Sequence, residues 1–92
     1  MGLGEIKLIM TFETLKFEGE DGDIQAIVKF KNGYEASVVQ NALSYGGDKG
    51  LYEIGVFNAA GGMCDPLDWG DDVKGWLNQE QVEKTLDKLA SV

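Results

Sequence analysis

The sequence contains no His and no Arg among its 92 residues, and its only Cys is Cys64. Without His, a Ser or Cys nucleophile lacks its usual general base, and a single Cys cannot supply a zinc site. A lone Cys also cannot form a disulfide within the chain. These absences exclude most nucleophilic and metal-dependent catalysis. We therefore expect a binding protein that is not an enzyme and carries no cofactor.

Long hydrophobic runs are also absent. The segment 6–10 is apolar apart from Lys7, but a helix that crosses a bilayer needs about 20 residues. The N-terminus has no signal-peptide pattern. With one Cys and no export signal, the sequence predicts a protein of a reducing cytoplasm that does not bind membranes.

Acidic residues are what the sequence has in excess. Sixteen Asp and Glu against eight Lys give a formal net charge of −8. Because that charge repels phosphates, we expect no direct contact with nucleic acid and favour a partner with a basic surface. Half of the acids fall in two short clusters, whose alternative interpretation is a surface that confers solubility. The first acidic cluster is Glu18, Glu20, Asp21 and Asp23, and the second acidic cluster is Asp65, Asp68, Asp71 and Asp72.

Three segments resemble ligand-binding loops without matching them. The segments 18–23 and 65–72 are acidic enough to attract a hard cation, but neither has the spacing of an EF-hand loop. The segment 45–50 is rich in Gly and includes Lys49, but a P-loop requires a Ser or Thr after its Lys and a helix after that. We therefore predict no specific metal site and interpret these segments as loops.

The clearest local pattern is a β-hairpin over residues 24–38. Apolar and polar residues alternate on both sides of a turn at 31–33. A two-residue loop would pair side chains of opposite faces, whereas a three-residue loop pairs Phe30 with Tyr34 and keeps the apolar side chains together. The pattern predicts a type I turn with a G1 bulge and Gly33 in the left-handed conformation.

The other strands are predicted from shorter alternating segments. Residues 51–58 carry apolar side chains on both faces, which indicates either a central strand or a strand with one face covered by a helix and the other partly by a loop. Gly and acidic residues predict a loop at 18–23, and Gly residues predict a turn at 59–62. The remaining expected strands are 5–10, 12–18 and a short edge strand at 63–67 that Pro66 interrupts.

A C-terminal helix completes the expected fold. Asn78 and Gln81 form a capping-box pattern at its start, after a short turn over 73–77. The sequence therefore predicts a single α+β domain over residues 1–92, an antiparallel sheet of four to five strands with the C-terminal helix packed on one face. Of the two Trp, we expect Trp76 to anchor the helix and Trp69 to be exposed. The predicted core is Phe17, Val28, Phe30, Ala36, Val38, Ile54, Val56, Trp76, Val82 and Leu86.

Two segments carry distinctive motifs. NGYEASVVQNALSYGGDKGLYEIGVFN begins at Asn32, and DDVKGWLNQEQV ends at Val82. Together they resemble a group of small phage and prophage accessory proteins with the pattern NGYxxSV, SYGGxxGLYE, DVxGxL and a final helix. The sequence departs from that pattern in CDPLDWGDD, residues 64–72. The resemblance implies a viral origin and activity in the cytoplasm of an infected bacterium, and it carries over no catalytic residue.

These observations favour a phage-encoded inhibitor that binds and blocks a host nucleic-acid-handling defence complex. Such a protein would be anti-CRISPR-like and would act as a nucleic-acid mimic, with both acidic clusters in contact with the partner and Trp69 as an aromatic anchor. One alternative is a self-assembling phage accessory protein that uses its sheet edges. Another is a small-ligand or metal-binding module. The sequence leaves open the oligomeric state and whether the two clusters are adjacent in space.

Overall fold

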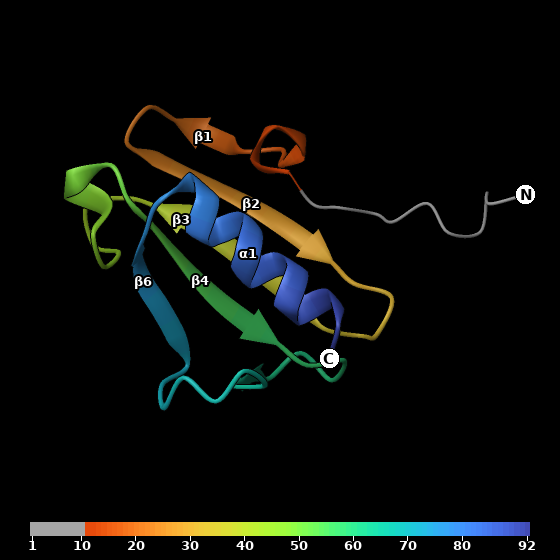
Figure 1. The fold of residues 1–92 in the computed structure, drawn as a ribbon. Helices are drawn as coiled ribbons and strands as arrows, with labels where there is room; N and C mark the ends of the chain where they lie inside the picture. Colours follow the sequence, from red (N-terminus) through yellow and green to blue (C-terminus); the bar gives the residue numbers. More distant parts are fainter. Residues whose placement is uncertain (1–10) are drawn as a thin grey trace, which may run out of the picture.

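The computed structural model describes residues 11–92, which form an antiparallel sheet with one helix across one face (Figure 1). The predicted α+β class is thus confirmed, with a sheet of six strands. They follow the order β1-β2-β3-β4, and both β5 and β6 pair along the outer edge of β4. The predicted strand at 5–10 lies outside the described residues. The elements are β1 (Glu18–Glu20), β2 (Asp23–Lys29), β3 (Glu35–Gln40), β4 (Tyr52–Phe57), β5 (Met63–Cys64), β6 (Val73–Leu77) and α1 (Gln79–Ala90).

The β2–β3 hairpin has the predicted register. Val28 pairs with Ala36, and the amide of Phe30 donates to the carbonyl of Tyr34 at 2.9 Å. Gly33 closes the three-residue loop with φ of +94°. This left-handed backbone is nearly free for Gly and costly for residues with a Cβ, so Gly33 fixes the register on which the rest of the sheet depends.

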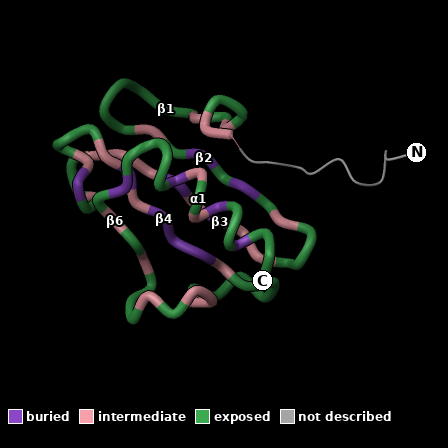
Figure 2. The backbone as a smooth tube through the Cα atoms, in the orientation of Figure 1, coloured by how far each residue is buried: buried purple, intermediate pink, exposed green. Residues whose placement is uncertain are grey.

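The core lies between the sheet and α1. Buried stretches occur in the central strands and in α1 (Figure 2). Most of the predicted core residues are buried there, and Phe17 and Phe30 pack at its margin. Ile54, in the central strand β4, is fully buried, because its side chain lies on the face of the sheet that α1 covers. The buried side chains are Ala26, Val28, Ala36, Val38, Tyr52, Ile54, Val56, Leu77, Val82, Leu86 and Leu89.

The helix α1 begins with the predicted capping box. The Asn78 side chain accepts a hydrogen bond from the Gln81 amide, and the Gln81 side chain accepts one from the Asn78 amide, both at 2.8 Å. At the other end, the Asn32 side chain donates to the carbonyl of Leu89 at 2.8 Å. The β2–β3 turn therefore caps the end of the helix, which holds α1 across one face of the sheet.

Two predictions for the N-terminal segment are wrong. Phe12–Thr14 is a short 3-10 turn rather than part of a strand, and its Phe12 amide donates to the Glu83 carboxylate of α1. The expected loop at 18–23 is instead a tight hairpin in which β1 pairs with β2. Gly19 makes this pairing possible, because it has φ of +121° and any Cβ there would collide with the backbone carbonyl of Asp23.

The segment before the helix also differs from the prediction. Residues 73–77 form the strand β6 instead of a turn, and Leu77 rather than Trp76 enters the core. The Trp76 side chain is 57% exposed, so its predicted role as the helix anchor is wrong. The expected edge strand at 63–67 is limited to Met63–Cys64, because Pro66 cannot donate to the ladder.

Among residues 11–92, no helix has the length and apolar content that crossing a bilayer requires.

Candidate functional site

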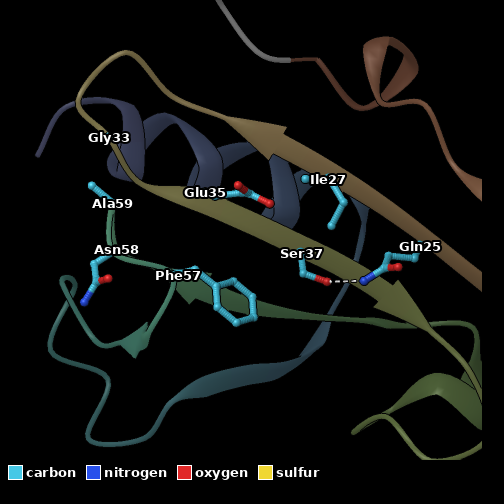
Figure 3. Close-up of a pocket in the computed structure, with 9 residues that line it drawn as sticks. Gln25, Ile27, Gly33, Glu35, Ser37, Phe57, Asn58 and Ala59 are labelled. Carbon is cyan, nitrogen blue, oxygen red and sulfur yellow. Dashed lines mark hydrogen bonds between the residues drawn. The ribbon is translucent and has the colours of Figure 1, made fainter.

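Within residues 11–92, no element covers the face of the sheet opposite α1, and we call it the open face. Because side chains alternate along a strand, the partners of the core residues in β2, β3 and β4 point to this side. Figure 3 views it with the helix behind the sheet. The side chains that the register places on the open face are Asp23, Gln25, Ile27, Lys29, Glu35, Ser37, Val39, Glu53 and Phe57.

A shallow hollow of about 360 Å³ lies on the open face, toward the β2–β3 turn and the C-terminal end of β4 (Figure 3). Ile27 and Phe57 form its apolar part, and Ile27 is 48% exposed. Across it the Gln25 amide donates to the Ser37 hydroxyl at 2.7 Å. Neutral polar groups beside exposed apolar side chains are typical of a contact surface.

Three members of the first acidic cluster belong to this same face. Glu18 pairs with Gln25, and Glu20 pairs with Asp23, so all three acids follow the alternation of the open-face side chains. Asp21 occupies the turn between the two strands. All four acids are exposed. The β1–β2 hairpin therefore forms an acidic rim on one edge of the open face.

The second acidic cluster lies in the connection between β5 and β6. The two carboxylate oxygens of Asp65 accept hydrogen bonds from the amides of Trp69 and Gly70, at 2.7 and 2.8 Å. Asp65 therefore holds the loop together, as Asp commonly does in turns. Asp68, Asp71 and Asp72 are exposed.

The two Trp residues have exchanged the environments that the sequence predicted for them. Trp69, expected to be exposed, is half-buried and packs against the core. Trp76, expected in the core, is exposed beside Tyr45. No sequence pattern predicts the exposure of Trp76, because that exposure depends on a bulge in β6.

The two acidic clusters lie on opposite edges of the sheet. β1 forms one edge, whereas the β5–β6 connection borders the other, beyond β4. Four interstrand spacings separate the two edges, which corresponds to about 20 Å. The structure thus gathers Glu18, Glu20 and Asp23 with the open face and places the second acidic cluster apart from them.

Cys64 lies beside the second acidic cluster. Burial raises the pKa of its thiol, and the neighbouring carboxylates of Asp65 and Asp72 raise it further. A raised thiol pKa disfavours the thiolate, the form that attacks electrophiles and binds metals. Within residues 11–92, no three His, Cys, Asp or Glu side chains are grouped closely enough to hold a metal ion.

Several residues of the open face escaped the sequence-based site prediction. Ile27, Val39 and Phe57 were visible as members of alternating strands, but the sequence alone did not say that their face would lack a covering layer.

The chain matches no protein-family model, and no curated protein or solved structure is significantly similar to it.

Proposed function

We propose that this protein is a non-enzymatic, phage-encoded inhibitor that binds a basic surface of a host nucleic-acid-handling defence complex, in the manner of an anti-CRISPR protein. The observation that carries the proposal is the placement of Glu18, Glu20 and Asp23 along the rim of an uncovered sheet face that also exposes Ile27. The viral origin and the bacterial host follow from the motifs at 32–58 and 71–82, which resemble those of small phage accessory proteins.

The acidic rim and the hollow would contribute to a protein–protein contact in different ways. Exposed carboxylates steer a basic partner toward the surface and orient it, while the apolar side chains provide the area that leaves water on binding. Ile27 and Phe57 provide that area in the hollow, next to the charged rim. A partner surface that normally binds nucleic acid is basic for the same electrostatic reason, so the rim would occupy positions that phosphates otherwise take.

The position of the second acidic cluster separates it from the partner contact that we propose for the open face. Because it lies about 20 Å from the rim, a flat contact on the open face does not need it. Asp65 is in addition engaged by the amides of its own loop. We therefore assign the partner contact to Glu18, Glu20 and Asp23, and we assign solubility and loop structure to the second acidic cluster.

The experiment is a capture assay from lysate of a bacterial host with active defence systems. The tagged protein is compared with the open-face variant, Glu18→Lys, Glu20→Lys and Asp23→Lys combined. A matched control, Asp68→Lys, Asp71→Lys and Asp72→Lys combined, makes the same charge change at the other edge. Each capture is run at low salt and at roughly 0.5 M salt, where the Debye length falls to about 4 Å.

We expect the wild type and the control to retain one nucleic-acid-binding complex at low salt and to release much of it at high salt. The open-face variant should retain none, with an unchanged circular dichroism spectrum. Loss in the control alone would move the contact to the β5–β6 connection. Equal capture by all three proteins would refute an acidic contact. We also expect the wild type and the control to inhibit the captured complex and the open-face variant to leave it active.

A further inference from the structure

Trp76 combines an exposed aromatic side chain with an unfavourable backbone. Its φ is +61°, in the left-handed region that residues with a Cβ seldom adopt, and 57% of its surface is exposed. A large aromatic side chain contributes most to stability when it is buried, yet here the neighbouring Leu77 is buried in its place. Local stability therefore does not account for Trp76, and strained backbone of this kind concentrates at functional sites.

A β-bulge causes the exposure. Tyr52 pairs with Leu77, and Ile54 pairs with Lys74, so the single residue Glu53 of β4 lies opposite two residues of β6. Those two residues are Gly75 and Trp76. A bulge redirects the side chains of the longer strand, and this one places Trp76 beside Glu53.

The backbone of Tyr45 is hydrogen-bonded to both Trp76 and Glu53. The Trp76 amide donates to the Tyr45 carbonyl at 3.0 Å, and the Tyr45 amide donates to Oε2 of Glu53 at 3.1 Å. Two glycines permit this close approach: a Cβ on Gly75 would collide with the Cβ and backbone of Tyr45, and one on Gly46 would lie 3.0 Å from the Trp76 ring. Tyr45 is also 57% exposed.

We propose that Trp76, Tyr45 and Glu53 form a receptor for an arginine side chain of the partner, an inference that rests on the proposed function for the partner's basic character. A guanidinium is planar, stacks on an aromatic face and makes directed hydrogen bonds to a carboxylate. The exposed rings provide the stacking surface, and the Tyr45 amide orients the Glu53 carboxylate. The ammonium of lysine is a point charge and gains less from such a site.

The position of Glu53 joins this receptor to the open face. Glu53 pairs with Val39, which pairs with Gln25, which in turn pairs with Glu18 of the acidic rim. One cross-strand row thus runs from the rim to the receptor. Lys74 pairs with the core residue Ile54 and so belongs to the opposite face, and the chain has no Arg of its own to occupy the site.

The test is an NMR titration of the nitrogen-15-labelled protein with tetra-arginine and with tetra-lysine peptides, over the same range of peptide concentration and at the same salt. The protein has two indole N–H signals, from Trp69 and Trp76, and the variant Trp76→Asn assigns them by removing one. Asn tolerates left-handed backbone, so this variant should fold at least as well as the wild type. Glu53→Gln keeps an acceptor for the Tyr45 amide and removes the charge.

We expect the Trp76 indole signal and the Tyr45 and Glu53 amides to respond at an at least threefold lower concentration of tetra-arginine than of tetra-lysine. Glu53→Gln should remove that preference. Equal responses to the two peptides, or responses centred on Trp69, would overturn the receptor.

The capture assay separates this inference from the proposed function. Trp76→Asn should weaken capture of the host complex about tenfold. If Trp76→Asn captures as well as the wild type while the open-face variant captures nothing, the arginine receptor is wrong and the proposed function stands. If both variants capture normally, both proposals fail.

Discussion

The two faces of the sheet are built from the same strands and have opposite surroundings. Toward α1, the side chains of β2, β3 and β4 are small or branched apolar groups without exposed area, such as Ala36 and Ile54. Toward the open face, the alternate residues mix carboxylates and amides with Ile27, which remains about half exposed. One face therefore explains why the chain folds. The other offers apolar area and charge that folding does not use, which is the property expected of a contact surface.

The largest expected effect compares two isoleucines on the two faces. Ile54→Ala removes a fully buried side chain and should lower the free energy of unfolding by about 2–5 kcal/mol. Ile27→Ala, on the open face, should cost no more than about 1 kcal/mol, because the side chain is already half exposed. Urea denaturation followed by circular dichroism measures both, and equal losses would contradict the assignment of the two faces.

The second prediction concerns the turn that decides which residues reach which face. Gly33→Ala should cost about 1–2 kcal/mol, because Gly33 has φ of +94°. The matched control is Gly62→Ala, where the new Cβ would make an ordinary contact 3.6 Å from the Asn58 side chain and the backbone is not left-handed. Thermal denaturation compares the two variants. A Gly33→Ala protein as stable as the control would show that the three-residue loop does not fix the register.

A smaller effect of opposite sign is expected on the acidic rim. Glu20 and Asp23 are directly opposite each other on neighbouring strands, and like charges in that position are destabilising. Asp23→Lys should therefore stabilise the fold by about 0.2–1 kcal/mol while it weakens partner capture. Asp21→Lys makes the same charge change in the turn, away from a direct cross-strand pair. Urea titration at low salt should show the larger gain for Asp23→Lys, and a loss of stability there would contradict the pairing.

The smallest effect concerns Cys64 at the outer edge of β4. Since burial and then Asp65 and Asp72 raise its thiol pKa, the thiol should remain protonated at a pH where an exposed Cys has begun to ionise. Alkylation by iodoacetamide at pH 8 should therefore be several-fold slower than that of free cysteine. Asp72→Asn should speed it modestly, and mass spectrometry follows the reaction. In the unfolded chain the thiol pKa returns to its usual, lower value. The contribution of Cys64 to the free energy of unfolding is therefore fully present below the unfolded pKa and is lost as the pH rises through the folded pKa.

Much of the fold was predictable because local patterns agree with tertiary packing. The alternation at 24–38 and the capping box at Asn78 predicted a hairpin register and a helix start that the structure confirms. The β1–β2 hairpin was missed because acidic residues at 18–23 resemble a solvated loop, and only the absence of a Cβ at Gly19 permits the pairing. The bulge that exposes Trp76 was equally invisible, since it depends on the pairing of β6 with β4.

The candidate site was predictable only in part. Composition singled out the acids, and the strand register then separated the rim from the second acidic cluster. The apolar contribution of Ile27 and Phe57 could not be assigned from alternation alone, because alternation does not reveal which face the single helix covers. That choice is made by the tertiary packing of Val82, Leu86 and Leu89.

Carboxyl footprinting of the complex with its captured partner tests the central claim most directly. Carbodiimide labelling followed by mass spectrometry reports the accessibility of each Asp and Glu in the free and bound protein. Protection of Glu18, Glu20 and Asp23, with Glu80 and Asp87 on the helix labelled as in the free protein, is the predicted result. Protection of the helix carboxylates with an unprotected rim would contradict the account, because the partner would then bind the outer surface of α1, on the opposite side of the sheet from the open face.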